Sequence, residues 1–447
     1  MRLLQPLDES QAKWYGTEHI VYKTLLYLLL IGVIRYLMQL VPRENFGFLI
    51  MGITFSFFVF GLLIWSFRSI SWKEILLVSC LMRLSLIDVP VQWSDDIYRF
   101  FWDGMKVRHL ESPYQMTPSE DERRTEWEAL YSQMNSVSFF SPYPPVLQYI
   151  WALTGNTTGN PIFLRLLWIA VDMGCIYLLH RLLARAQRAR WHVLWYAWNP
   201  LVLIEGIGQL HPEVLMLFFV LLGLWCFENH WNFGLGLSIG LAICTKLWPV
   251  LILPLLINRM PRADWIRTST IALGVCIVLF VPLLRPSALS GMASSFLLYY
   301  QSFEFNASLY YVIKGIYSWM VPESGGAMVS RWLGVAWLVF VARLIWGRQL
   351  TLPVALYCTF FVLALTSAVV HPWYLIPLLA YGLLANRFAI LFWSPLVFMS
   401  YSHYANGQFQ EEAAWIAAEY LLLAAFLWAE WKLRTDMTLG EAERIKE

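Results

Sequence analysis

The densest group of ionisable and aromatic side chains in this chain lies between Trp93 and Arg108. It begins with two adjacent carboxylates, Asp95 and Asp96, where an apolar stretch of membrane-spanning length over residues 74–92 ends. On a helix, consecutive side chains point about 100° apart, so one carboxylate can face a cavity while the other orients a neighbour. A carboxylate beside an apolar wall can be tuned in basicity, as a general base requires. Asp95 and Asp96 are therefore the candidate catalytic residues.

The residues that follow favour a functional site over an ordinary solvated helix end. Aromatic rings and charges of both signs fall within one short stretch, at Tyr98, Arg99, Trp102, Asp103, Lys106 and Arg108. Aromatic faces can pack on sugar rings, while arginine and lysine bind phosphates. Ionisable clusters at a membrane boundary are commonly functional. The cluster is therefore interpreted as the catalytic centre of an integral membrane enzyme, with Tyr98, Arg99 and Asp103 as substrate-binding candidates.

The composition predicts an all-α integral membrane protein with about 13–14 transmembrane helices. The 447 residues are 59% hydrophobic and 14% charged, unlike a soluble domain. Apolar runs of membrane-spanning length recur along the chain. The predicted spans are 20–41, 46–67, 74–92, 161–184, 191–208, 212–228, 232–258, 264–285, 329–347, 351–370, 373–386, 388–405 and 411–431. The net charge of +2 does not indicate nucleic-acid binding, and the six isolated cysteines are interpreted as small buried hydrophobes.

The distribution of Lys and Arg predicts the topology. Residues 181–190 form the most basic short loop and are placed in the cytoplasm, which puts residues 93–160 outside. Residues 258–267 are also basic, so the run 232–258 is expected to be two short helices meeting at Lys246 and Pro249. Both termini are then cytoplasmic, and the chain forms a single polytopic membrane domain. Its two long outer stretches are a catalytic loop at 93–160, with an amphipathic helix over Ser119–Glu128, and a second loop at 286–328.

Further polar candidates lie at the ends of other spans. Lys246 either snorkels to an interface or binds the phosphate of a lipid-linked substrate. His211 and Glu213 share a short outward turn and could serve a phosphate, a metal or the acceptor, although their spacing matches no closed metal site. His371, Trp373 and Tyr374 cap another span, where the aromatic pair is also typical of an interfacial belt. Arg165 and Asp172 lie on one helix face and are expected to form a structural pair.

Six ordered motifs resemble those of multispan mannosyltransferases that use polyprenyl-phosphate sugar donors. These enzymes have the C-type glycosyltransferase fold. The motifs run over about residues 90 to 375: Asp95-Asp96-Ile-Tyr-Arg-Phe-Phe-Trp-Asp103-Gly with Ser112-Pro-Tyr, Tyr143-Pro-Pro-Val-Leu-Gln148, Trp198-Asn-Pro-Leu with Glu205 and His211, Thr245-Lys-Leu-Trp-Pro, Phe305-Asn306-Ala-Ser and His371-Pro-Trp-Tyr. Two motifs depart from the family pattern, since Ser112-Pro-Tyr114 replaces its usual Asn-Pro-Tyr and His211-Pro-Glu213 replaces its His-Asn-Asp.

The resemblance implies transfer of a hexose, mannose by analogy, from a polyprenyl-phosphate donor to a glycan or lipid-linked acceptor. It implies that Asp95 or Asp96 deprotonates the acceptor hydroxyl, which attacks the anomeric carbon with inversion. Lys246, Arg99 and His211 would stabilise the departing phosphate. The enzyme is expected in a bacterial plasma membrane with its site facing outward. No cofactor follows from the motifs, and a divalent cation is left open, as are the acceptor and the lipid length.

The same resemblance predicts that Tyr143 and Asn306, from the two outer stretches, come together over Asp95 and Asp96. The alternative for Asn306 is that it caps the helix beginning near Ala307 and Ser308. Two other functions stay open from the residues alone. The first is a transporter or flippase for a lipid or lipid-linked sugar, which would favour internal repeats and polar groups at the membrane midplane. The second is an O-antigen ligase or polymerase, which would lack the Asp-Asp-x-Tyr-Arg cluster.

Overall fold

The computed structural model describes residues 17–66, 70–301, 303–321, 325–347, 350–407 and 409–444. Within these ranges every extended regular element is a helix, and a single parallel bridge pairs Phe305 with Val369. The all-α membrane architecture predicted from composition is therefore confirmed. The predicted cytoplasmic location of the two chain ends concerns residues 1–16 and 445–447, which lie outside the described residues.

Six helices in the described part of the chain are long and apolar enough to cross a membrane. They are α1 (Thr17–Leu40), α2 (Phe46–Ser66), α7 (Ile162–Arg185), α12 (Arg262–Phe280), α15 (Gly325–Trp346) and α19 (Ala413–Arg444). A seventh span results if a bent pair of helices counts as one. The number is lower than the 13–14 spans predicted, because the other apolar runs fold as short or broken helices.

The short helices fill the space between the long ones. They include α3 (Trp72–Leu84), α8 (Leu194–Ala197), α16 (Leu352–Thr366), α17 (Leu375–Ala385) and α18 (Ala389–Leu396), which contains Pro395 and continues as the 3-10 helix η10 (Val397–Gly407). The π-helix η6 (Val202–Gly208) meets α9 (Glu213–Glu228) at an angle of 105°. This bend places the turn containing His211 between two apolar helices.

The run 232–258 is broken where the sequence predicted. Helix α10 (Asn232–Ile243) ends before Lys246, and the chain resumes in η7 (Trp248–Leu251) and α11 (Ile252–Leu256). The break lies against the first outer stretch, since the backbone N–H of Val146 donates to the carbonyl of Cys244 at 2.9 Å. At 1.5 Å per residue, neither half is long enough to cross a hydrocarbon core of about 30 Å alone.

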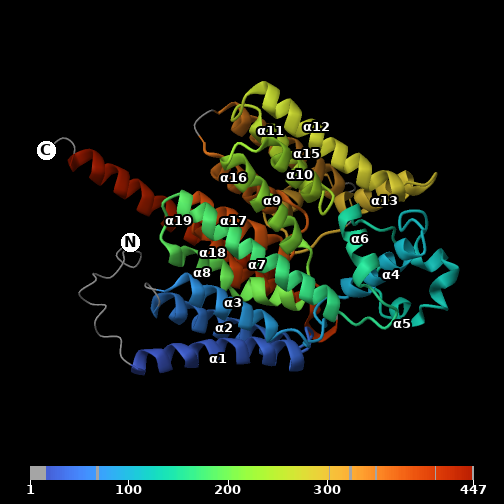
Figure 1. The fold of residues 1–447 in the computed structure, drawn as a ribbon, viewed down its shortest axis with the longest axis horizontal. Helices are drawn as coiled ribbons and strands as arrows, with labels where there is room; N and C mark the ends of the chain where they lie inside the picture. The colour runs from blue at the N-terminus through green and yellow to red at the C-terminus, as the bar shows by residue number, and fades with distance from the viewer. Residues whose placement is uncertain are drawn as a thin grey trace.

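Residues 93–160 form a compact helical cap at one end of the molecule. It contains α4 (Asp96–Arg108), the 3-10 helices η3 (Pro118–Glu120) and η4 (Glu122–Arg124), α5 (Glu128–Tyr131) and α6 (Pro145–Thr154). Figure 1 shows α4, α5 and α6 at the end opposite to where α1 begins and α19 ends. Helices α4 and α6 pack closely because position 104 is glycine, where a Cβ would lie 2.4 Å from the carbonyl oxygen of Trp151.

The predicted amphipathic helix over Ser119–Glu128 is wrong. Pro118 begins η3 with a capping box, in which Thr117 and Glu120 bind each other's backbone amides. One residue later the carboxylate of Asp121 accepts from the backbone N–H of Arg123 and begins η4. Such local bonds between side chains and backbone compete with a continuous helix. Charge alone therefore overstated the helical length of this segment.

The second outer stretch contains α13 (Ala288–Gln301) and α14 (Leu309–Met320). The hydroxyl of Ser295 donates to the carbonyl of Phe140 at 2.7 Å, which ties α13 to the helical cap. Figure 1 also shows α13 at the same end of the molecule as α4 and α6.

The expected pair between Arg165 and Asp172 is also wrong, although both residues are fully buried. Asp172 pairs with Arg83 of α3 at 2.5 Å and accepts from the hydroxyl of Tyr196 at 2.6 Å. Arg165 donates to four backbone carbonyls, those of Ile87, Val89, Ile207 and Gly208. Both residues therefore join helices, as structural residues do, with partners that lie far away in the sequence.

Candidate active site

The two adjacent carboxylates face different neighbours. Asp95 immediately precedes α4, and its Oδ2 accepts from Nη2 of Arg43 at 2.8 Å and from the side-chain amide of Asn135 at 3.4 Å. Arg43 also donates to the carbonyl of Trp93 at 3.2 Å, and its guanidinium lies 4.7 Å from the ring centre of Tyr404. The connection between α1 and α2 therefore fixes the orientation of Asp95.

Asp96 faces a mixed group of charges and a phenol. Burial raises the pKa of Asp96 from 3.8 to about 6. The negative charges of Asp95 and Glu213 raise this pKa as well, while the positive charge of Lys246 and a hydrogen bond from Tyr143 lower it. A carboxylate with a pKa near 6 is ionised at neutral pH and still accepts a proton readily, which suits a general base.

Lys246 lies beside Asp96 in the break between α10 and η7. Its ammonium donates to Oε1 of Glu213, the first residue of α9, whose side chain is only 1% exposed. It also lies 4.7 Å from the ring centre of Tyr374. A second oxygen of Glu213 is buried and has no hydrogen-bond partner among the described residues. An ammonium held in this way leaves part of its hydrogen-bonding capacity for an anion.

The histidines and Trp373 form a stacked column beside this ion pair. The ring of His211 stacks on Trp373 at 3.5 Å between ring centres, and His371 stacks on its other face at 4.3 Å. Phe305 covers His371 at 4.6 Å. Because both faces of Trp373 are occupied, this indole has no face left for a sugar ring. Trp373 instead orients the two imidazoles.

Both imidazoles of the column are uncharged at neutral pH. Burial, together with the positive charge of Lys246, lowers the pKa of His371 to about 3. Burial likewise lowers the pKa of His211. Neither ring nitrogen of His211 has a hydrogen-bond partner among the described residues, although its Nε2 lies 3.3 Å from Oε2 of Glu205. His211 is therefore available to a substrate as a neutral donor or acceptor.

Arg99 and Asp103 are buried and bind the protein itself. They pair at 2.8 Å across one turn of α4. Arg99 donates to the carbonyls of Ser136 and Phe139, while Asp103 accepts from the side chains of Ser141 and Gln148. These bonds position the segment before Tyr143, whose hydroxyl reaches Asp96. Lys106 has a similar role, since it pairs with Asp121 and Glu111 at 2.5 Å.

Asn306 directly follows Phe305, which forms the parallel bridge with Val369 and whose ring stacks on His371. Its side-chain amide donates to the carbonyl of Val370 at 3.4 Å and to Glu419 of α19 at 3.3 Å. Its backbone has a positive φ of 49°, a conformation that asparagine tolerates well. Helix α14 begins at Leu309 after Ser308, so Asn306 is not its N-cap. Asn306 therefore holds the second outer stretch against α19.

Residues 46–262 match the family model described as alpha-(1->6)-mannopyranosyltransferase, N-terminal domain. This matched region, slightly less than half of the chain, is similar to that mannosyltransferase family. The matched region includes both aspartates, Tyr143, His211, Glu213 and Lys246, so most of the cluster around Asp96 lies within it. The long apolar helices and the family together make the chain a membrane glycosyltransferase.

Several residues of this mannosyltransferase site were missed by sequence reasoning. Arg43 precedes the matched region and lies 52 positions before its partner Asp95. Tyr401 donates to Glu205 at 2.9 Å, and Tyr404 lies under Arg43. Both tyrosines belong to η10, whose sequence resembles an ordinary apolar span. The tyrosines in this segment were the available signal, because polar aromatics inside an apolar run usually have partners.

The sequence left open whether the mannosyltransferase binds a metal. Within the described residues, no three His, Cys, Asp or Glu side chains form a group that could hold a metal ion.

Proposed function

We propose that the protein transfers mannose from a polyprenyl-phosphate donor to a glycan or lipid-linked acceptor, with inversion at the anomeric carbon. The observation that carries this proposal is the juxtaposition of Asp96, with its pKa of about 6, and the ammonium of Lys246. Lys246 lies in the break between α10 and η7, where it contacts Glu213 of α9 and the ring of Tyr374, just before α17. A base and a cation in one half-buried site are what an alcohol nucleophile and a phosphate leaving group require.

In this mechanism Asp96 removes the proton of the acceptor hydroxyl. The acceptor oxygen forms a bond to the anomeric carbon as the bond from that carbon to the phosphate oxygen breaks. The electron pair of the breaking bond stays on the phosphate, whose added negative charge lies near Lys246. Asp96 ends protonated and returns its proton to solvent. Preorganised charges of this kind stabilise a transition state without reorganisation.

Asp95 has a different role from Asp96. Its carboxylate is engaged by Arg43 and Asn135, and it raises the pKa of Asp96 through its negative charge. Asp95 is therefore a tuning and positioning residue, while Asp96 is the base. Glu213 holds the ammonium of Lys246 toward Asp96, and the neutral imidazole of His211 contacts the phosphate or the donor sugar. Arg99 and Asp103 position Tyr143 by fixing the segment before it.

The site faces the extracytoplasmic side in this proposal. Two observations support it: the basic loop at 181–190 and the location of α4 and α6 at the end opposite to where α1 begins (Figure 1). A lipid-linked donor could then reach Lys246 from the outer leaflet.

The test uses purified protein reconstituted in lipid nanodiscs and three radiolabelled donors. These are polyprenyl-phosphate mannose in its β-linked form, the same lipid in its α-linked form, and GDP-mannose. Because an α-linked product formed with inversion needs a β-linked donor, only the β form should support transfer or hydrolysis. Use of GDP-mannose would refute the lipid donor, and use of the α-linked lipid would refute inversion.

A further inference from the structure

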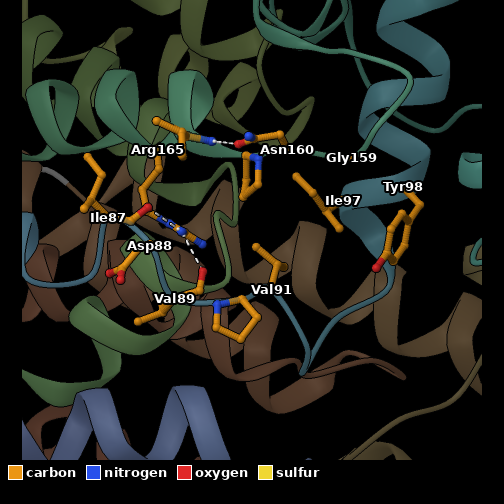
Figure 2. Close-up of a pocket in the computed structure, with 12 residues that line it drawn as sticks. Ile87, Asp88, Val89, Val91, Ile97, Tyr98, Gly159, Asn160 and Arg165 are labelled. Atoms are coloured by element: carbon orange, nitrogen blue, oxygen red, sulfur yellow. Dashed lines mark hydrogen bonds between the residues drawn. The ribbon is translucent and has the colours of Figure 1, made fainter.

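A pocket beside Tyr98 and one face of α14 both lie outside the proposed mechanism. The pocket has a volume of about 300 Å³ and is shown in Figure 2. Its charged groups are held by the protein, since Arg35 donates to both oxygens of Asp88 and Arg165 donates to four backbone carbonyls. The outward face of α14, by contrast, is apolar and exposed. The pocket therefore offers little to a ligand, whereas the face of α14 requires an apolar partner.

The large exposed side chains of α14 form a single apolar stripe. They follow one another at intervals of one or three residues, which is the spacing of one side of an α-helix. Trp319, near the end of the helix, is 87% exposed. Side chains gathered in this way are stabilised by an apolar partner that removes them from water. The stripe contains Leu309, Val312, Ile313, Ile316, Trp319 and Met320.

The opposite face of α14 is polar and is bound to the protein. Tyr310 donates to Oε1 of Glu304 at 2.7 Å, and Lys314 donates to both oxygens of the same carboxylate at 2.6 Å. The hydroxyl of Tyr311 donates to Glu411, which lies just before α19. These bonds fix the rotation of the helix about its own axis. The apolar stripe therefore cannot turn inward unless they break.

Helix α14 lies beside the beginning of a membrane-spanning helix. Tyr310 packs with Val329 and Leu333, which belong to the first turns of α15. Helix α15 is long and apolar enough to cross a membrane, and it exposes large apolar side chains of its own, among them Trp332 and Val335. A lipid bilayer around α15 therefore reaches the level of α14.

The length and the charges of α14 place it at the surface of that bilayer. Its 12 residues extend over about 18 Å at 1.5 Å per residue, which is too short to cross a hydrocarbon core of about 30 Å. The half-buried ion pair of Lys314 and Glu304 would be costly inside hydrocarbon, but water can reach it at the boundary. A short helix with one apolar and one polar face lies in the plane of the interface, where tryptophan is also favoured.

We propose that the apolar face of α14 binds the lipid surface of the membrane, with Trp319 among the headgroups and the rest of the stripe toward the acyl chains. The lipid is recognised by apolar burial and not by charge, because Lys314 is the only cation of α14 and is already paired with Glu304. The proposed function enters only in naming the side of the membrane, since its orientation makes this surface the outer leaflet.

The lipid contact would also set the depth of the candidate site. Glu411, which binds Tyr311 of α14, accepts from the backbone N–H of Asn306 as well. Helix α14 thus holds the segment whose Phe305 stacks on His371. With α14 in the interface, the histidine column lies near the depth of the lipid headgroups, which is where the phosphate of a lipid-linked donor lies.

The first experiment detects the lipid contact directly, in the full-length chain with all six cysteines, reconstituted in nanodiscs of dioleoylphosphatidylcholine. Trp319→p-benzoylphenylalanine is irradiated, and the products are analysed by mass spectrometry. The expected product is an adduct of the protein with one phospholipid. Glu126→p-benzoylphenylalanine is the control, because Glu126 is an exposed residue of the helical cap. Absence of a lipid adduct at position 319, an equal yield at both positions, or a crosslink to a second copy of the chain would each overturn the proposal.

The second experiment measures depth with nitroxide labels on single cysteines in a cysteine-free chain. Val312→Cys and Ile316→Cys report on the stripe, Val335→Cys on the middle of α15, and Glu126→Cys on water. The ratio of collisions with oxygen to collisions with a water-soluble nickel chelate should lie between the two reference values at both stripe positions. A ratio equal to either reference would overturn the interfacial location, and so would protection from both reagents. Neither experiment uses mannose transfer, so failure of this inference is distinguishable from failure of the proposed function.

Discussion

Lowering the pH from about 7 to about 5 should reduce kcat/KM about tenfold. With a pKa of about 6, Asp96 is roughly nine-tenths ionised at pH 7 and roughly one-tenth ionised at pH 5. The group must be deprotonated to act as a base, so activity is present above its pKa and is lost as the pH falls through it. An aspartate with the ordinary pKa of 3.8 would still be more than about nine-tenths ionised at pH 5 and would give almost no loss.

The acidic limb of the pH profile is the fall in kcat/KM between about pH 7 and pH 5. Removing a negative charge near Asp96 and removing a positive one should shift this limb in opposite directions along the pH axis. Glu213→Gln removes a negative charge that raises the pKa of Asp96, so the limb should move to lower pH. Lys246→Met removes a positive charge that lowers this pKa, so the limb should move to higher pH. The remaining groups that act on Asp96, namely Asp95 and Tyr143, are unchanged in both variants. Glu126→Gln is the control, because Glu126 is exposed and pairs only with Arg123 among the described residues.

The assay is the initial rate of mannose transfer from β-linked polyprenyl-phosphate mannose at limiting donor, measured at half-unit intervals of pH. Rates are compared only where thermal unfolding shows that each variant is folded. A rate that stays constant down to pH 5 would refute Asp96 as a base tuned by burial. So would a limb that moves upward in Glu213→Gln, since the charge arrangement around Asp96 would then be wrong.

Three further predictions follow from the geometry. Arg43→Gln should lower kcat by about 10- to 100-fold with donor KM unchanged, because Asp95 loses a charged hydrogen bond. Arg43→Lys should recover part of the rate, and the control Glu44→Gln should leave kcat unchanged. Equal rates in Arg43→Gln and wild type would contradict this. In a cysteine-free background, Glu126→Cys should react with a membrane-impermeant thiol reagent in intact cells, because residues 93–160 are placed outside. Arg262→Cys should not react, because residues 258–267 are placed in the cytoplasm. Labelling of position 262 from outside would contradict the cytoplasmic location of that segment and the topology after it. Asn306→Ala and Asn306→Gly should both lower the free energy of unfolding by about 1–3 kcal/mol, because Glu419 loses a buried partner. Thermal or denaturant unfolding measures this change. If only the alanine variant were destabilised, backbone strain at positive φ would account for the effect instead.

The sequence predicted the break at Lys246 for a sound physical reason. The basic segments 181–190 and 258–267 are separated by three predicted spans, so they cannot both be cytoplasmic unless the last of these, 232–258, turns back. Lys246 and Pro249 mark the place in that run where a helix is weakest. The helix bounds agree with this, because α10 ends at Ile243 and η7 begins at Trp248. The number of spans could not be obtained in the same way. Hydropathy measures the length of an apolar run, and a buried broken helix such as η6 is as apolar as a crossing one.

The pairing of side chains was less accessible from the sequence. Arg165 and Asp172 share a helix face, yet Asp172 pairs with Arg83 on another helix, because tertiary packing brought a closer cation. Trp373 was a substrate-binding candidate or an interfacial aromatic from the sequence, and its stacking against His211 and His371 could not be read from the spacing. Arg43 had no local signal at all, since its role depends on the approach of the connection between α1 and α2 to Asp95. Contacts between elements distant in the chain are fixed by packing, which spacing in a sequence does not encode.

The most direct test of the account compares Asp96→Asn with Asp95→Asn in nanodiscs supplied with β-linked polyprenyl-phosphate mannose and an acceptor that the wild type uses. Replacing a carboxylate by an amide preserves shape and removes basicity. Asp96→Asn should lose about 10²- to 10⁴-fold in kcat, the usual contribution of a general base. Asp95→Asn should lose less and should still lose activity as the pH falls from 7 to 5. Transfer by Asp96→Asn at the wild-type rate would contradict the assignment of Asp96 as the catalytic base.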